Sequence, residues 1–177
     1  LSNDDLASRL SYFLWSSMPD GELRKLAATG RLRQPEILQA QVKRMLQDDR
    51  VRGLATEFTG NWLGFRRFQE HNSVDRGRFP VFTDELRQAM FEEPIHFVVD
   101  LLQQDRSVVT LLDAKHTFVN ATLARHYGIP DDRFEAVETA GQGGAISGPG
   151  PWLKIDDADV YGRGGLLPMS VFLTKNA

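Results

Sequence analysis

The sequence predicts a mainly α-helical protein, an irregular multi-helix bundle that ends in a Gly-rich, mostly irregular C-terminal arm. Three observations lead to this fold class. Apolar residues recur at spacings of three and four from residue 6 to residue 101, the period of a helix with one buried side. Residues suited to helix caps stand before most of these stretches. Strand-like runs do not alternate with helices anywhere, so a doubly wound sheet is disfavoured.

The first 62 residues are expected to form four helices. Ser2 and Asp5 have the spacing of a capping box ahead of the first helix. Pro19 and Pro35 suit the first turns of the second and third helices, where a missing backbone N–H costs nothing. A fourth helix is expected at 51–62, where apolar residues again recur at spacings of three and four.

The longest helix is expected at 83–104, after a loop. Pro94 lies inside it and removes one backbone donor, so we expect a kink there. The run 105–130 is expected to form two short helices joined by a tight connection, with Ser107 capping the first and Gly128 ending the second. The total expected is about seven or eight helices, within the range of a single helical domain of this length.

The composition changes after residue 130, where glycine and proline become frequent. We therefore expect a helical domain at 1–130, a Gly/Pro-rich connecting arm at 131–160, and at 161–177 the start of a truncated second domain packed on the first. Within these segments 141–150 is flexible by composition, 152–155 is expected to be a short strand or an extended stretch, and 164–173 a last apolar helix.

Charge and composition exclude several classes of function. The net charge of −3 is too small to indicate binding to nucleic acid or to an acidic membrane. The chain has no cysteine, which excludes a disulfide framework, a thiolate zinc site and a Cys-x-x-Cys-His haem attachment within it. No apolar run approaches the roughly 20 residues that span a bilayer. Because the chain opens with leucine, we expect it to be a piece of a longer protein.

Glu93 and His96 have the Glu-x-x-His spacing of carboxylate-bridged di-metal bundles, which places both side chains on one helix face together with Glu92 and Asp100. Such a centre needs a second copy of the motif, and the sequence has none. No metal or cofactor site is therefore predicted. The alternative is the solvated polar face of an amphipathic helix. Glu93, His96 and Asp100 remain the candidates for a catalytic site, if the chain has one.

Two further histidines have structural explanations. His116 precedes Thr117, where a polar residue can cap a helix, and His126 lies in a last helical turn, where the helix dipole favours a partly positive imidazole. Capping and packing are favoured for both over roles as ligand or base, and Asn120 is a candidate helix cap.

Several long motifs resemble one bacterial family. Residues 6–20 are similar to its opening, and Phe91-Glu-Glu-Pro94 and residues 105–128 match further motifs in the same order. The family is the planctomycete-type domain of unknown function 1592. Residues 161–177 resemble the start of its usual partner, domain of unknown function 1588.

The resemblance implies a large, exported, multi-domain bacterial protein, periplasmic or extracellular, often with a c-type cytochrome domain elsewhere in the polypeptide. Any haem c would belong to a domain outside this chain, and the expected partners are the other domains of the parent protein. The resemblance supplies no catalytic residue and no oligomeric state.

Three functions follow as expectations. The first is a scaffold or docking module in an oxidoreductase that contains a c-type cytochrome. The second is an enzyme domain, hydrolytic or acting on polysaccharide, with its site around Glu93, His96 and Asp100; it requires a concave pocket at those side chains. The third is a purely structural domain of an extracellular assembly.

Overall fold

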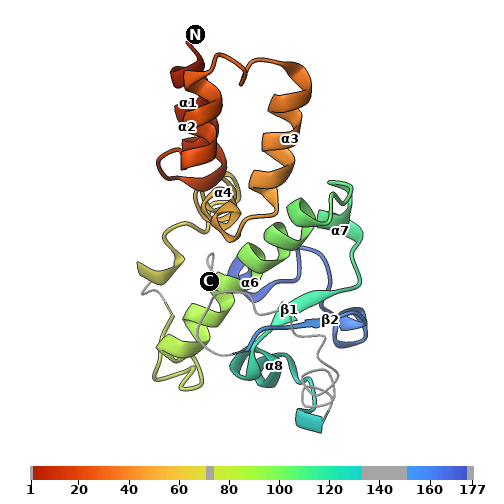
Figure 1. The fold of residues 1–177 in the computed structure, drawn as a ribbon. Helices are drawn as coiled ribbons and strands as arrows, with labels where there is room; N and C mark the ends of the chain where they lie inside the picture. The colour runs from red at the N-terminus through yellow and green to blue at the C-terminus, as the bar shows by residue number, and fades with distance from the viewer. Residues whose placement is uncertain (1, 71–73, 133–150, 175–177) are drawn as a thin grey trace. The chain divides into compact units, whose positions relative to one another are not determined.

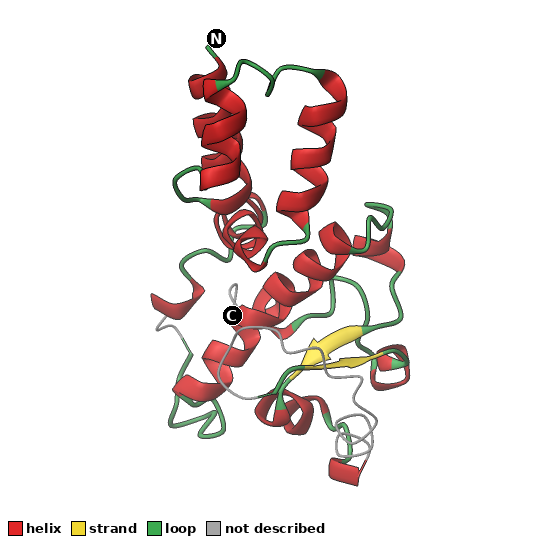
Figure 2. Ribbon diagram, viewed as in Figure 1, coloured by secondary structure: helices red, strands yellow, loops and turns green. Residues whose placement is uncertain are grey.

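The computed structural model describes residues 2–70, 74–132 and 151–174. Helices dominate, and two short strands form a small sheet (Figure 2). The mainly α-helical fold class is thus confirmed. The chain divides into two compact units, Leu1–Trp62 and Leu63–Ala177. Each unit has its own core, and each is described by itself.

The first unit contains three regular helices followed by a run of short helical segments (Figure 1). The regular helices are α1 (Asn3–Trp15), α2 (Gly21–Ala28) and α3 (Pro35–Leu46). The short segments are the 3-10 helix η1 (Asp49–Val51), α4 (Arg52–Leu54), the π-helix η2 (Ala55–Thr59) and α5 (Gly60–Trp62). The predicted fourth helix is therefore present but irregular, with a π turn in its middle.

Helix caps in this unit follow the prediction. The backbone N–H of Asp5 donates to Ser2 Oγ, and the backbone N–H of Ser2 donates to a carboxylate oxygen of Asp5, both at 3.0 Å. Pro35 occupies the first turn of α3. Asp20, rather than Pro19, begins α2, because its carboxylate accepts the backbone N–H of Leu23 at 2.9 Å.

Trp15 organises the core of the first unit. Its Nε1 donates to the carbonyl of Met45 at 2.9 Å, which ties α1 to the end of α3. The Arg50 guanidinium lies 3.5 Å from the centroid of the Trp15 ring. Gly53 lets α4 approach α1 closely, since a Cβ at that position would lie 2.6 Å from the Trp15 carbonyl oxygen. A small residue is required at this crossing.

The second unit is built around one long helix (Figure 1). Its elements in order are the 3-10 helix η3 (Phe68–Glu70), α6 (Asp84–Gln103), α7 (Thr110–Asp113), β1 (Thr117–Val119), α8 (Ala121–Tyr127), β2 (Leu153–Ile155), the 3-10 helix η4 (Ala158–Tyr161) and α10 (Ser170–Thr174). Helix α6 runs without interruption through Pro94. Strand β1, α8 and α10 all contact it.

The sheet is an antiparallel pair, in which Thr117 faces Ile155 and Val119 faces Leu153. The expected strand at 152–155 is thus confirmed. Strand β1 was not expected, because 105–130 was predicted to contain only helices. Three residues are too few to show a period, and the pairing partner lies more than thirty residues further along the chain. Asn120 caps α8 as expected, accepting the backbone N–H of Leu123 at 2.9 Å.

The last predicted helix is shorter than expected and begins at Ser170 rather than at residue 164. Gly165 has a φ of 65°, in the left-handed region that ends helices, and Leu166 N–H donates to the carbonyl of Leu111 at 2.8 Å instead of to a helical partner. The Gly-rich stretch 141–150 lies outside the described residues. None of the described helices has the length and apolar character that crossing a membrane requires.

Candidate functional site

The candidate residues lie on a helix that is buried on all sides. Every α6 residue from Ala89 to Val99 is buried. Glu93 and His96 have no exposed surface at all, and Glu92 is 4% exposed. The expectation that these side chains form a solvated polar face is therefore wrong. The reason is the antiparallel β1–β2 strand pair, whose strand β1 packs on α6 and whose neighbour Trp152 lies against His96.

The carboxyl group of Glu93 accepts hydrogen bonds from two neutral hydroxyl groups. Thr117 Oγ1 on β1 donates to Glu93 Oε1 at 2.6 Å. The Tyr127 hydroxyl on α8 donates to Glu93 Oε2 in a short hydrogen bond. Burial raises the pKa of Glu93 to about 7, while these two donors and the positive charge of Arg163 act in the opposite direction.

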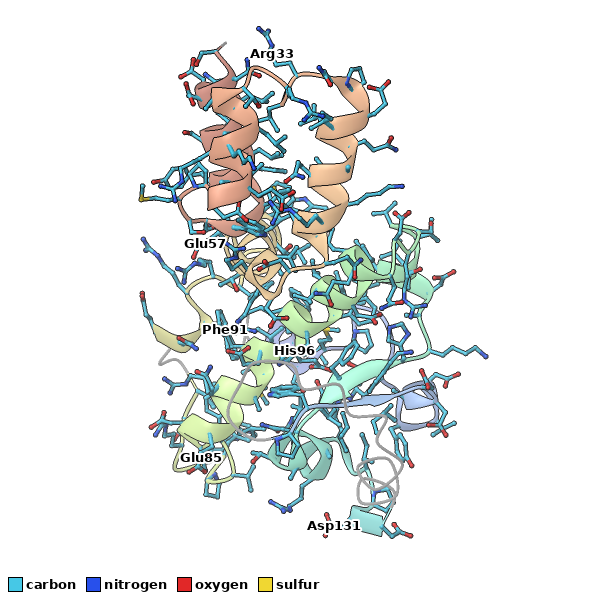
Figure 3. The ribbon with its side chains drawn as sticks, viewed as in Figure 1. Arg33, Glu57, Glu85, Phe91, His96 and Asp131 are labelled. Carbon is cyan, nitrogen blue, oxygen red and sulfur yellow. The ribbon has the colours of Figure 1, made fainter. Side chains whose placement is uncertain are left out.

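His96 packs between aromatic rings. Its ring centroid lies 4.2 Å from that of Trp152, just before β2, and 6.4 Å from that of Phe118 on β1. Its Nε2 is 3.9 Å from a carboxylate oxygen of Glu92, one turn earlier, rather than paired with Glu93. Figure 3 labels His96 midway along α6. The Glu-x-x-His spacing thus leads to two separate environments, and not to a shared ligand site.

Asp100 is the most accessible of the three candidates. Arg106 Nε donates to Asp100 Oδ2 at 2.9 Å, and His116 Nε2 lies 3.6 Å from the same oxygen. Burial alone would raise the pKa of Asp100, but the approach of His116 and Arg106 outweighs it and lowers the pKa below its usual value. The His116 ring also stacks on Phe97 at 4.9 Å, so the expected packing role of His116 is confirmed. The expected cap is wrong, because Thr117 begins strand β1 and not a helix.

The three candidates share one helix face, as predicted, but each contacts a different residue in or next to the β1–β2 strand pair. Glu93 contacts Thr117, His96 contacts Trp152, and Asp100 contacts His116. An acid–base mechanism needs its groups within reach of one substrate atom. The three side chains on this face of α6 instead hold the helix against the β1–β2 strand pair.

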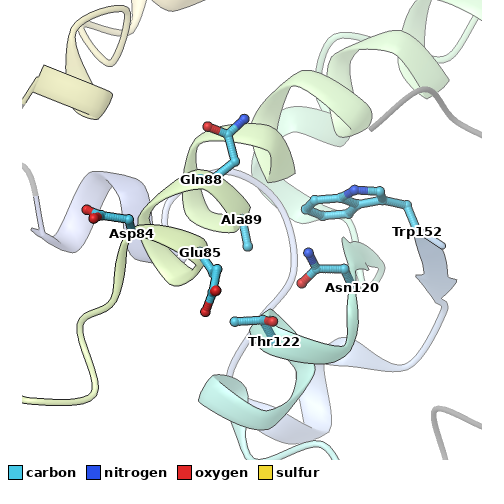
Figure 4. Close-up of a pocket in the computed structure, with 7 residues that line it drawn as sticks. All are labelled: Asp84, Glu85, Gln88, Ala89, Asn120, Thr122 and Trp152. Carbon is cyan, nitrogen blue, oxygen red and sulfur yellow. The ribbon is translucent and has the colours of Figure 1, made fainter. Parts of the chain in front are cut away.

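One pocket of about 350 Å³ opens where the first turns of α6 meet α8 (Figure 4). Its lining residues are Asp84, Glu85, Gln88, Ala89, Asn120, Thr122 and Trp152. Several of their polar groups already have structural partners. Asp84 pairs with Arg76 and Arg87, and Gln88 donates to Glu92 at 2.9 Å. The pocket offers hydrogen-bonding groups, but no acid–base pair.

A second pocket, of about 480 Å³, shares Glu85 and Thr122 with the first. Its other lining residues are Val81, Thr83, Leu86, Arg125 and His126. His126 Nε2 lies 3.2 Å from Ser170 Oγ. Burial, with a smaller contribution from Arg163, lowers the pKa of His126, so the imidazole is neutral near pH 7. Neither pocket is lined by Glu93, His96 or Asp100.

Sequence reasoning missed the residues that surround Glu93. Thr117, Tyr127 and Ser170 are distant in sequence, and the spacing of residues on α6 carries no information about them. A signal for the burial of α6 was present, however. Phe91, Ile95 and Val99 are apolar residues on a different side of the helix from Leu86, Met90 and Phe97, and a helix that is apolar on all sides is a core helix. Within the described residues no three or more His, Asp or Glu side chains form a group that could hold a metal ion.

The fold and the site define a mainly α-helical domain in which Glu92, Glu93 and His96 of the longest helix are buried beneath a small antiparallel strand pair. The chain belongs to the family described as a protein of unknown function (DUF1592), whose model matches residues 1–129. That match ends directly after α8 and does not include β2, η4 or α10. No curated protein and no solved structure matches the chain.

Proposed function

We propose that this chain is a helical scaffold or docking domain of a larger exported bacterial protein, in which a c-type cytochrome domain elsewhere in the polypeptide carries the redox chemistry. Residues 161–177 are, in this proposal, the start of the partner domain of unknown function 1588. The observation that carries the docking role is a group of exposed apolar side chains around α7 and η4. The burial of Glu93 and His96, whose side chains make interior contacts, argues against a catalytic site on α6. Membership of the family supports the wider context.

Exposed apolar side chains supply a surface for docking. In the second unit, the segment around η4 runs beside α7, since Asp159 N–H donates to the carbonyl of Lys115 and Leu166 N–H to that of Leu111. These two adjacent segments expose Val108, Val109, Leu112, Val160 and Leu167 by 56–69%. Such a concentration of apolar side chains marks a protein contact more often than open solvent. We call these five residues the α7 surface.

The two pockets described above give the enzymatic alternative no support. A hydrolytic or polysaccharide-acting domain needs a pocket at Glu93, His96 or Asp100, and neither of the two pockets above is lined by any of them. The purely structural alternative differs from docking only in its partner, which would be a separate assembly rather than the parent polypeptide. The experiment below separates them.

Binding of the 177-residue chain to the rest of the parent polypeptide tests the docking role. We expect a complex on size-exclusion chromatography, and Leu112→Asp and Leu167→Asp should each weaken it about 10-fold or more, the size of losing one buried apolar contact. Val81→Asp, at another exposed apolar position, is the matched control. Absence of a complex with the wild-type chain would refute docking. Co-purification with a separate assembly alone would favour the structural alternative.

The redox context has its own test. An absorption spectrum and metal analysis of the intact parent protein should show a c-type haem. A parent protein without haem and without redox activity would contradict this part of the proposal while leaving the docking result intact.

A further inference from the structure

The carboxyl group of Glu93 on α6 is linked by hydrogen bonds to three other segments of the second unit: β1 and α8 directly, and α10 through Tyr127. Thr117 on β1 and Tyr127 on α8 donate directly to its two oxygens. The chain of hydrogen bonds then continues outward, because the backbone N–H of Ser170, at the start of α10, donates to the Tyr127 hydroxyl oxygen at 3.0 Å. Ser170 is 3% exposed. Glu93 thus anchors the C-terminal segment 163–174, which lies beyond the part of the chain that the family model matches.

Apart from the contact between His126 and Ser170, the other anchors of this segment do not change charge between pH 5 and pH 8. Met169 and Val171 are buried, and the Phe172 ring lies edge-on to Phe65 at 5.8 Å. The Leu166 N–H donates to a backbone carbonyl. Any dependence of the segment on pH in this range must therefore come from titratable side chains around it.

Several titratable and charged groups stand on the elements around the segment. Besides Glu93 they are Asp84, Glu85, Arg87, Glu92, His96 and Asp100 on α6, Asp113 on α7, His116 ahead of β1, Lys154 on β2, Arg125 and His126 on α8, Asp159 on η4, and Arg163 within the segment itself. Lys154 is paired with Asp156, and His116 is next to Asp100. Arg163 lies 4.2 Å from the centroid of the Tyr127 ring and donates to the carbonyl of Pro168. Two of these titratable groups connect to α10: Glu93 through the Tyr127 hydroxyl, and His126 through its contact with Ser170.

Opening of the segment would bring water to Glu93. A carboxyl group in the dry interior resists ionisation, and burial raises the pKa of Glu93 to about 7, against 4.5 for the same group in water. Once hydrated, the group ionises as an ordinary glutamate. Opening near neutral pH is therefore coupled to release of a proton, and a rise in pH favours the open form.

We propose that Glu93 is a proton-operated latch for residues 163–174: protonated, it holds the segment on α6 and α8, and ionised, it lets the segment open more often. The proposal does not depend on the docking role. Tyr127 is the connecting group, since its hydroxyl contacts both the carboxyl group and the backbone of α10.

Amide hydrogen exchange in the full 177-residue chain measures the opening directly. With rates corrected for the intrinsic effect of pH, the amides of residues 166–173 should open more often between about pH 5 and about pH 8, by on the order of 100-fold, as the difference between the buried and the hydrated carboxyl group requires. In Glu93→Gln, which keeps a neutral side chain of the same shape, this dependence should disappear. Glu85→Gln, an exposed carboxylate on the same helix, should retain it.

His126 supplies a competing explanation with the opposite sign. Protonation of its imidazole at low pH would disturb the contact with Ser170 and loosen α10 in acid rather than in base. Protection that rises with pH, or that does not change with pH, would overturn the proposal. The same holds for a pH dependence that persists in Glu93→Gln.

The wild-type chain allows a second test if the Glu93→Gln variant does not fold. The carboxyl carbon of Glu93 can be followed by NMR as the pH is changed. A midpoint near 7 is expected, and a midpoint near the ordinary value for glutamate would exclude the latch.

Discussion

Each unit contains an acidic side chain that holds its elements together, and the two are solvated differently. Asp20 in the first unit caps α2, pairs with Arg44 at 2.8 Å and lies 3.7 Å from Arg50, with 21% of its side chain exposed. Glu93 in the second unit has no exposed surface, and its hydrogen-bond donors are neutral hydroxyl groups.

The surroundings move the two pKa values in opposite directions. Partial burial would raise the pKa of Asp20, but the hydrogen bonds and charge of Arg44, with the Leu23 N–H and Arg50, outweigh it and lower the pKa below 3.8. Burial dominates at Glu93 and raises its pKa to about 7. A carboxylate with a charged partner and access to water stabilises a fold as an anion, whereas a carboxyl group that burial cuts off from water stabilises it best when protonated, even though its two hydroxyl donors favour the anion.

Replacing the two acids by alanine should give the largest difference between the units in the free energy of unfolding. Glu93→Ala leaves a cavity and two buried hydroxyl groups without an acceptor, which should lower the free energy of unfolding by about 3 kcal/mol. Asp20→Ala removes one helix cap and a half-exposed ion pair, for about 1 kcal/mol. Urea denaturation near pH 6 measures both. Equal losses would show that the neutral network contributes no more than the cap.

The second largest difference between Glu93 and Asp20 should be the way in which stability depends on pH. The pKa of Glu93 is raised in the folded chain, so its contribution is complete below pH 4.5 and is lost as pH rises through about 7; the full loss is on the order of 3 kcal/mol. Asp20 has the opposite sign, because its contribution is present above 3.8 and is lost as pH falls through its lowered pKa.

Urea denaturation over a series of pH values measures this profile. In Glu93→Gln the decline between pH 4.5 and 7 should vanish while the loss in acid remains. A decline of unchanged size in the variant would assign it to another group.

Local features of both units could be predicted from the sequence, and contacts over long distances could not. The capping roles of Ser2 and Asn120 and the first-turn position of Pro35 depend on neighbours within three or four residues, and all three are present. The candidates Glu93, His96 and Asp100 do share one face of α6. What covers that face is a strand pair whose two strands are more than thirty residues apart in the chain, with α8 between them.

The burial of the candidate residues also depended on contacts that are distant in the sequence. A polar triplet at helical spacing is usually solvated, and Phe91, Ile95 and Val99 were the local evidence against this interpretation. The partners of Glu93 could not be inferred at all, because Thr117 and Tyr127 reach it only after β1 and α8 have packed on α6.

A smaller loss of stability should follow a substitution at Gly53, where α4 crosses α1 in the first unit. A Cβ at Gly53 would lie 2.6 Å from the carbonyl oxygen of Trp15, so Gly53→Ala must push α4 away from α1 and should cost about 2 kcal/mol. Gly21→Ala, at the first position of α2 with no atom within 4 Å of the added methyl group, is the matched control and should be near neutral. Thermal unfolding of the two variants measures the difference. Comparable midpoints would mean that α4 shifts at little cost.

The smallest effect should come from Arg50, which links the charged cluster of the first unit to its aromatic core. Its guanidinium donates to Asp48 at 2.7 Å, lies 3.7 Å from Asp20 and stacks over the Trp15 ring. The side chain is 42% exposed, so water and salt weaken its ion pairs, and Arg50→Lys should cost only about 0.5–1 kcal/mol.

The dependence of this loss on salt distinguishes its two sources. Lysine retains the charge but loses the planar stacking on Trp15, and salt screens charge pairs rather than stacking. The loss in Arg50→Lys should therefore persist at about 1 M salt, whereas the loss in Asp20→Asn should shrink under the same conditions. Urea denaturation at low and high salt measures both. If the loss in Arg50→Lys also shrinks, the ion pairs and not the Trp15 ring account for the role of Arg50.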